Sequence, residues 1–204
     1  MFKKVTPENI AFFCSALIVA LLCYCHAVVA PVVGEEMRYA SIAWRMSMDH
    51  QWLIPHIGDH AYLHKPPLLF WLLIISWKTC LNAPWTVIWP FLFAISCLYM
   101  TQRLTVFLFP DQKSIACLSP LVLVAMPFFI NNVGIFRFDM LLTWSNLAAC
   151  YCLFRSLSCR HYYWGFVFAN ALGLLTKGPV IYLFTIPEAH FLRYIFVRVF
   201  DSMP

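Results

Sequence analysis

Four groups of charged residues lie next to apolar segments, and their residue types can bind or transfer charge. A carboxylate can deprotonate a nucleophile or hold a cation, whereas Lys and Arg neutralise a phosphate. Each group alone could simply mark a membrane boundary. Charges at the mouths of several apolar helices are costly unless they meet other charges, so together they predict a polar cavity. In chain order the groups are Glu35-Glu36, His64-Lys65, Arg137-Phe138-Asp139 and Lys177.

The composition is typical of a membrane protein. Of 204 residues, 62% are hydrophobic, 18% aromatic and only 11% charged, against roughly 25% charged residues in a soluble domain. A chain this apolar cannot hide its apolar surface in a water-soluble core. The net charge of +5 then bears on membrane orientation. Because the basic residues form no cluster of the nucleic-acid-binding kind, we expect membrane lipids and no nucleic acid as partners.

Nine cysteines could suggest a disulfide framework, but most of them lie inside apolar runs, where cysteine behaves as a small hydrophobic residue. Cys23, Cys25 and His26 could begin a metal site. A zinc site needs further ligands, and the neighbouring sequence offers none. We therefore expect these cysteines to pack rather than to bind a metal.

The first apolar segment, 11–33, follows Lys3 and Lys4. Its 23 residues exceed the core of a secretory signal, which is about 7–15 residues long, so we expect a retained helix. Segment 68–77 is short, and an apolar run of about 10–14 residues is more often interfacial or re-entrant than spanning. Further apolar segments cover 85–109, 115–130, 140–154, 162–175 and 180–197.

The distribution of Lys and Arg predicts which segments cross, because cytoplasmic loops collect these residues. If 68–77 does not cross, three basic pairs share the side of Lys3 and Lys4, namely Arg103 with Lys113, Arg155 with Arg160, and Arg193 with Arg198. We therefore predict an all-α integral membrane protein with about six spans and cytoplasmic termini. It would form one transmembrane domain over 1–204, with an external loop over 34–84 that contains juxtamembrane helices.

The four charged groups, taken in order with their neighbours, resemble the N-terminal part of the polyprenol-phosphate-dependent membrane glycosyltransferases of the C-type fold. The closest subgroup is the aminoarabinose transferases that modify lipid A, beside enzymes similar to protein mannosyltransferases. The motifs are Glu35-Glu36-Met37-Arg38-Tyr39-Ala40, His64-Lys65-Pro66-Pro67, Arg137-Phe138-Asp139 and Leu175-Thr176-Lys177-Gly178-Pro179.

That resemblance implies a C-type helical bundle in the bacterial inner membrane, with its active face in the periplasm. It implies an inverting transfer from a polyprenyl-phosphate-linked sugar to a lipid A-like or other periplasmic acceptor. Glu35 and Asp139 match the two catalytic acids, and Lys65 matches the lysine that binds the donor phosphate. The positions implied to bind substrate are Glu36, Arg38, Tyr39, Lys65, Arg137 and Lys177.

Two residues depart from the family pattern. Glu35 is one methylene longer than the usual aspartate, and a shift of this kind can cost about 10²-fold in rate. His64 stands where the closest relatives have a glutamate that helps to hold a metal. Histidine can also bind zinc, but it is neutral and differently shaped. We expect no required cofactor, and a divalent metal at His64 is left as an open alternative.

Two other functions stay open from the sequence. Family members run to several hundred residues, so the resemblance leads us to expect a truncated or partial enzyme, or one completed by a second chain. Such a chain could instead be an inactive scaffold that binds lipid. A small transporter could use Glu188 and His190 as an ion site, although the inverted repeats typical of transporters are not evident. The residues do not specify the sugar or the acceptor.

Overall fold

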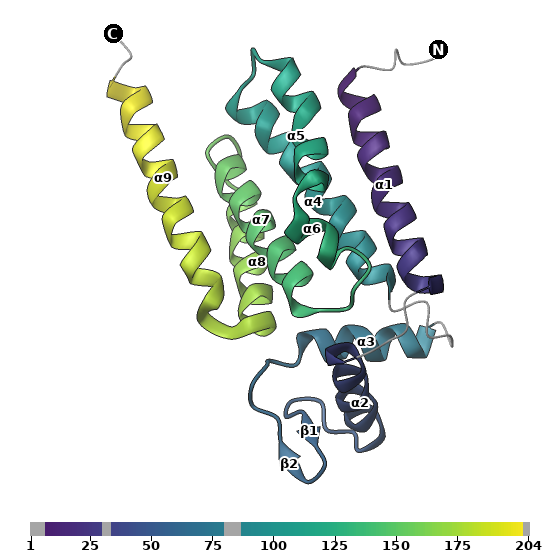
Figure 1. The fold of residues 1–204 in the computed structure, drawn as a ribbon. Helices are drawn as coiled ribbons and strands as arrows, with labels where there is room; N and C mark the ends of the chain where they lie inside the picture. The colour runs from purple at the N-terminus through teal and green to yellow at the C-terminus, as the bar shows by residue number, and fades with distance from the viewer. Residues whose placement is uncertain (1–6, 30–33, 80–86, 202–204) are drawn as a thin grey trace.

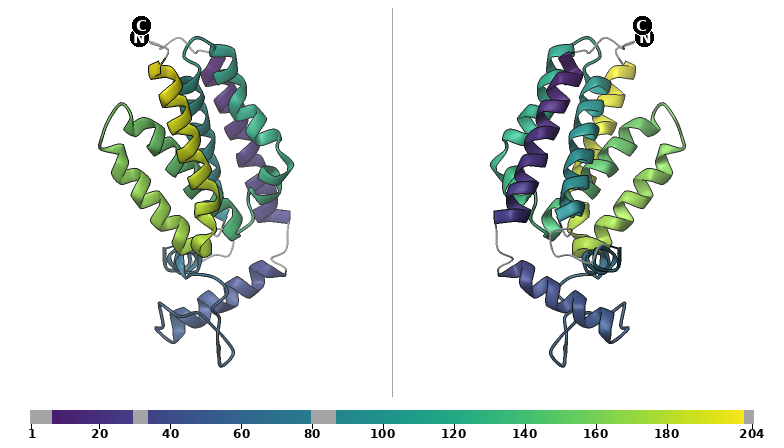
Figure 2. Two further views of the ribbon diagram at one scale, coloured as in Figure 1. Left: turned by 90° about the vertical axis from the view of Figure 1, so that its left-hand side faces the viewer. Right: turned by 90° about the vertical axis from the view of Figure 1, so that its right-hand side faces the viewer.

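A computed structural model describes residues 7–29, 34–79 and 87–201, and it confirms the prediction of an all-α protein (Figure 1). Most of the helices lie alongside one another in a bundle, and both ends of the chain point to the same end of it (Figures 1 and 2). The bundle helices are α1 (Pro7–Val29), α4 (Ile88–Leu108), α5 (Lys113–Ala125), α7 (Phe138–Ser156), α8 (Tyr162–Lys177) and α9 (Tyr182–Asp201).

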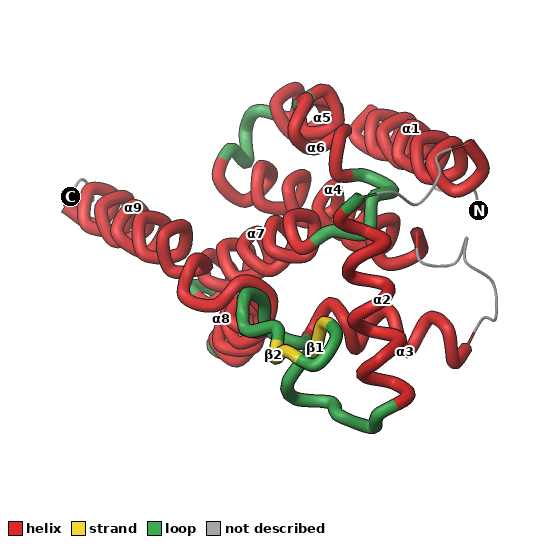
Figure 3. The backbone as a smooth tube through the Cα atoms, turned by 60° about the horizontal axis from the view of Figure 1, so that its bottom comes forward, coloured by secondary structure: helices red, strands yellow, loops and turns green. Residues whose placement is uncertain are grey.

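Residues 34–79 form a separate layer at the opposite end of the bundle, where α1 ends and α4 begins (Figures 1 and 2). This layer consists of α2 (Glu35–Met48), a hairpin of β1 (His56–Ile57) and β2 (His60–Ala61), and α3 (Leu68–Thr79). Helix α3 lies across the end of the bundle and packs against α2 and α8 (Figure 3). Its 12 residues span only about 18 Å, less than the roughly 30 Å of a hydrocarbon core.

Within the described residues, three helical stretches are long and apolar enough to cross a membrane: Asn9–Val28, Ile88–Leu108 and Tyr162–Phe191. The third is not one straight rod. Helix α8 ends at Lys177, because Gly178 adopts φ 68°, a left-handed value that favours glycine. A 3₁₀ turn over Gly178–Ile181 (η2) follows, and α9 then runs back along α7 (Figure 1).

The apolar segment 115–130 is divided into two helices, which the sequence analysis did not predict. Helix α5 ends at Ala125, and α6 (Pro127–Asn132) begins two residues later. Met126 between them is extended, with ψ 122°, because a residue before proline is pushed away from the helical region. A second proline, Pro120, is accommodated inside α5.

Helix α7 is the central element of the bundle and contacts α4, α6, α8 and α9. Its start also reaches the outer layer, because Phe138 and Leu141 share one buried cluster with residues of α2 and α3. Between these two residues, Met140 packs on residues of α1 and α4. The same helix therefore contributes to the core of the bundle and to the contact between the bundle and the outer layer.

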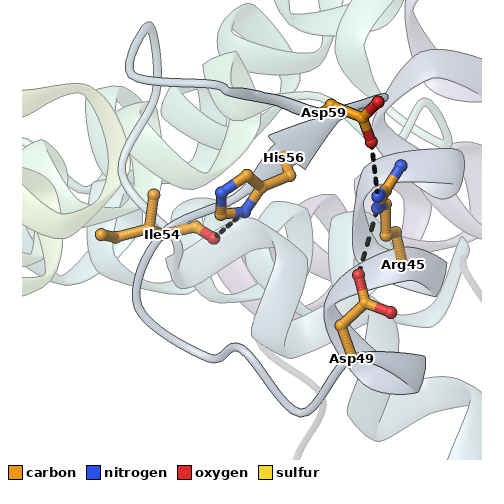
Figure 4. Close-up of polar contacts among 5 residues, drawn as sticks. All are labelled: Arg45, Asp49, Ile54, His56 and Asp59. Atoms are coloured by element: carbon orange, nitrogen blue, oxygen red, sulfur yellow. Dashed lines mark hydrogen bonds and ion pairs between the residues drawn. The ribbon is translucent and has the colours of Figure 1, made fainter.

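The loop after α2 is tied by polar contacts on its surface (Figure 4). Arg45 Nε donates to Asp49 Oδ2 at 3.1 Å, and Arg45 Nη2 donates to Asp59 Oδ1 at 3.4 Å. One ring nitrogen of His56 lies 2.9 Å from the carbonyl oxygen of Ile54. Exposed ion pairs of this kind typically contribute about 0–1 kcal/mol, so they shape the loop more than they stabilise the fold.

The two ends of the bundle should be accessible from opposite sides of the membrane. Asp59 lies in the outer layer, and Asp111 lies between α4 and α5 at the far end. In a background without native cysteines, an impermeant maleimide added to intact cells should label Asp59→Cys but not Asp111→Cys. Both variants should react after permeabilisation. Labelling of both positions in intact cells would contradict the predicted orientation.

Candidate functional site

Three of the four charged groups found in the sequence converge on the segment 136–139 at the start of α7, which contains the fourth group, Arg137-Phe138-Asp139. Glu36 reaches it from α2, Lys65 from the loop before α3, and Lys177 from the end of α8. Each of these side chains contacts a different residue of the segment. Groups that are up to 142 positions apart in the chain, from Glu35 to Lys177, are thereby gathered at one end of the bundle.

Glu36 joins the outer layer to the bundle. Its Oε1 accepts a hydrogen bond of 2.7 Å from the backbone N–H of Phe136, and only 11% of its side chain is exposed. His26 Nε2, in the last turn of α1, lies 3.9 Å from the same oxygen. A carboxylate that accepts from a backbone N–H makes a strong, charge-assisted hydrogen bond. The Glu36 carboxylate is therefore already paired with groups of the protein itself.

Gly134 makes this contact possible. It adopts φ +86°, and a Cβ added there would lie 3.0 Å from Cβ of His26 and 3.4 Å from Cα of Cys23. A larger residue would meet both a strained backbone conformation and the packed end of α1. The loop can therefore approach α1 closely enough to present the N–H of Phe136 to Glu36.

Glu35, in contrast, is accessible, with 54% of its side chain exposed. Arg38 Nη2 donates to it at 3.0 Å, and the hydroxyl of Tyr39 donates to its other oxygen at 3.4 Å. Burial raises the pKa of the Tyr39 phenol, and the negative Glu35 beside it adds to the increase, so the phenol keeps its proton at neutral pH. Arg38 and Tyr39 thus hold the Glu35 carboxylate in place, while more than half of the Glu35 side chain stays accessible.

Lys65 is held beside an aromatic cluster. Tyr39 and Phe138 meet edge to face at 5.0 Å between ring centres, and Lys65 Nζ lies 5.6 Å from the centre of the Phe138 ring. Pro66 and Pro67 fix the backbone after Lys65, and the carbonyl of Pro67 accepts the first hydrogen bond of α3. No described carboxylate forms an ion pair with Lys65, so its charge is free to meet an anion.

Asp139 and Lys177 form a close ion pair, with 2.5 Å between Nζ of Lys177 and Oδ1 of Asp139. Asp139 lies in the first turn of α7 and Lys177 in the last turn of α8. Each charge therefore also interacts favourably with the dipole of its own helix. About a third of the Asp139 side chain and a fifth of the Lys177 side chain are exposed, at 33% and 22%, so both can be reached from outside.

The ion pair borders a cavity of about 570 Å³, within the size range of sites for small molecules. Asp139, Thr143 and Asn146 lie at spacings of four and three on α7, and they form a polar stripe along one wall. The rest of the wall is largely apolar, so the cavity suits an amphipathic molecule. Its other lining residues are Thr101, Leu123, Phe128, Leu142, Leu147, Lys177, Val180 and Phe184.

A polar pair deeper in the bundle was not predicted. Asn146 Nδ2 donates to Glu188 Oε1 at 2.9 Å, which links α7 to α9. The remaining oxygen of each side chain is buried and has no hydrogen-bond partner among the described residues. The position of Asn146, seven residues after Asp139, is the signal that could have placed it on the same helix face. From the sequence, Glu188 was expected only as an ion site of a transporter.

Three of the predicted residues are less closely involved. Arg38 pairs with Glu35 on the surface of α2. Arg137 is half-buried, and its Nε has no hydrogen-bond partner within the described residues. His64 is exposed, and its ring packs 5.3 Å from that of Tyr62. In the part of the chain that the structure describes, no three His, Cys, Asp or Glu side chains form a group that could hold a metal ion.

Comparison with known proteins adds no relative: no family profile, no curated protein and no solved structure matches the chain. The resemblance to membrane glycosyltransferases therefore stays a prediction.

The two neighbouring glutamates should differ in their effect on stability. Glu36→Ala leaves the buried N–H of Phe136 without an acceptor, which should cost about 1–3 kcal/mol of unfolding free energy. Glu35→Ala removes an exposed ion pair, which should cost less than about 1 kcal/mol. Unfolding of both variants in detergent, followed by tryptophan fluorescence, measures the difference. Equal losses would show that Glu36 does not join the two layers.

Proposed function

We propose that this chain is a membrane glycosyltransferase, which moves a sugar from a polyprenyl-phosphate donor to a lipid or other acceptor outside the cytoplasm. One observation supports this best: an accessible carboxylate and an unneutralised ammonium flank the same pair of aromatic rings. Glu35 contacts the hydroxyl of Tyr39, and Lys65 lies over the ring of Phe138, which packs on Tyr39. Such a site can activate an acceptor and bind a phosphate within one small region.

The arrangement of the helices supports a C-type membrane architecture in this proposal. Helices α1, α4, α5 with α6, α7, α8 and α9 would provide six spans, while α3 lies across the bundle and does not cross. The site then faces the periplasm of a bacterial inner membrane. Lys113 at the start of α5 and Arg160 between α7 and α8 lie at the opposite end, which is the cytoplasmic end by the distribution of positive charge.

In the proposed reaction, Glu35 takes a proton from the acceptor hydroxyl as its oxygen attacks the anomeric carbon. The bond between that carbon and the phosphate oxygen breaks, and the configuration of the carbon is inverted. Polyprenyl phosphate leaves with an increased negative charge, which the ammonium of Lys65 stabilises. Half-buried Arg137 offers a second cation to the phosphate.

Asp139 and Lys177 would orient the sugar at the mouth of the cavity. One accepts hydrogen bonds and the other donates them, so together they can bind both kinds of group on a sugar ring. The largely apolar walls beside them suit the first isoprene units of the donor. Glu36 and Tyr39, which the resemblance implied to bind substrate, would act by holding the segment 136–139 in place.

Substitutions in the site should separate catalysis from donor binding. Glu35→Gln keeps the shape of the side chain but cannot accept the proton, so sugar transfer should fall by about 10²–10⁴-fold while donor binding survives. Lys65→Ala should weaken donor binding and make it less sensitive to salt, because a phosphate contact is lost. Asp139→Asn should reduce sugar transfer to an extent between the effects of Glu35→Gln and Lys65→Ala. Transfer of a radiolabelled sugar in membranes, which keep any other required chain present, measures each effect.

Asp111→Asn is the matched control, because it removes an exposed carboxylate at the far end of the bundle. It should transfer sugar as well as the unaltered chain does. Full activity of Glu35→Gln would remove Glu35 from the mechanism. If neither the unaltered chain nor any variant transfers sugar but the donor lipid still binds, the chain is a lipid-binding scaffold without catalysis.

The pair of Asn146 and Glu188 favours a small transporter as a second candidate. Glu188 lies inside the bundle and has one buried oxygen without a partner among the described residues, as an ion or proton site requires. Uptake of a labelled solute into proteoliposomes that is lost in Glu188→Gln would support this function. Sugar transfer that is unchanged in Glu188→Gln would argue against it.

A further inference from the structure

A second pocket lies at the opposite end of the bundle from the candidate active site. It has a volume of about 330 Å³ and lies between the last turns of α4 and α7. Phe107 and Phe154 pack edge to face at 6.4 Å between ring centres and hold these two helix ends together. The lining residues are Arg103, Val106, Phe107, Pro110, Tyr151 and Arg155.

Both arginines in this pocket lack a negatively charged partner. Neither Arg103 nor Arg155 forms an ion pair with a carboxylate of the described residues, and no acidic residue lines the pocket. The Nε of Arg155 is buried and has no hydrogen-bond acceptor among the described residues. Two like charges beside each other and a buried N–H without a partner are unfavourable unless an anion binds there.

Aromatic rings orient both guanidinium groups. Arg103 Nε donates to the hydroxyl of Tyr99 at 3.2 Å, and Arg155 lies 5.3 Å from the ring centre of Tyr162. These contacts limit the number of side-chain conformations that an anion would have to fix. The planar guanidinium presents its donors in a fork that matches phosphate oxygens, which makes arginine the preferred residue for phosphate recognition.

We propose that the pocket of Arg103 and Arg155 binds a phosphate group, supplied by the headgroup of an anionic phospholipid. Tyr99 and Tyr151 each lie one helical turn closer to the middle of the bundle than Arg103 and Arg155. Their rings suit the start of an acyl chain that runs from the phosphate toward the bilayer interior. Basic pockets between membrane helices are typical sites for anionic headgroups. The site is separate from the candidate active site and does not depend on the proposed transferase activity.

The test uses the full chain in detergent, with phosphatidylglycerol, phosphatidylcholine and inorganic phosphate as separate probes. Binding is measured by native mass spectrometry and by the shift in unfolding temperature. The unaltered chain should bind phosphatidylglycerol in preference to phosphatidylcholine, and less tightly at high salt. Each of Arg103→Gln and Arg155→Gln should weaken binding roughly tenfold, because each removes a charge-assisted contact. Arg155→Lys should recover only part of it, because the fork is lost.

Arg160→Gln is the matched control, because Arg160 is exposed at the same end of the bundle but does not line the pocket. It should bind phosphatidylglycerol as the unaltered chain does, and all variants should unfold at similar temperatures without lipid. Binding of inorganic phosphate that depends on both arginines, without any binding of phosphatidylglycerol, would support a phosphate site but overturn the lipid as its source. Equal binding of both lipids, or unchanged binding when Arg103→Gln and Arg155→Gln are combined in one chain, would overturn the proposal.

Discussion

The hydrogen bond from the backbone of Phe136 to Glu36 is the contact on which the arrangement of the site depends. It joins the outer layer to the bundle, and only 11% of the Glu36 side chain is exposed. A carboxylate in that position is favourable only while the N–H faces it. The same short segment also presents Phe138 to Lys65 and Asp139 to Lys177, so Glu36 helps to hold the residues that both lysines contact.

The two ends of the bundle balance their charges differently. At the end with the outer layer, acidic and basic side chains occur together, and Asp139 and Lys177 each lie at the helix end whose dipole favours them. At the other end, Arg103 and Arg155 have aromatic neighbours but no carboxylate partner among the described residues. The first end can therefore bind a ligand with groups of both signs, whereas the second requires an anion from its surroundings.

Proline and glycine decide where the elements begin and turn. Pro66 and Pro67 separate Lys65 from the start of α3. Pro127 separates α6 from α5, and Gly178 reverses the chain between α8 and α9. These residues act through local backbone conformation, so their effect can be predicted from sequence. The split at Pro127 was missed because hydrophobicity continues through it, and an apolar run does not distinguish one helix from two.

The sequence by itself determined that the chain is helical and apolar, and that four charged groups lie at the ends of its apolar segments. Composition and the order of residues along the chain are sufficient for both conclusions. It could not decide which of two adjacent glutamates is buried, because Glu35 and Glu36 differ only in the direction that each takes from α2. Only the tertiary structure placed His26 and Phe136 beside Glu36, and it alone paired Asn146 with Glu188 across 42 residues. Contacts between distant segments depend on how helices pack, and one sequence does not specify that packing.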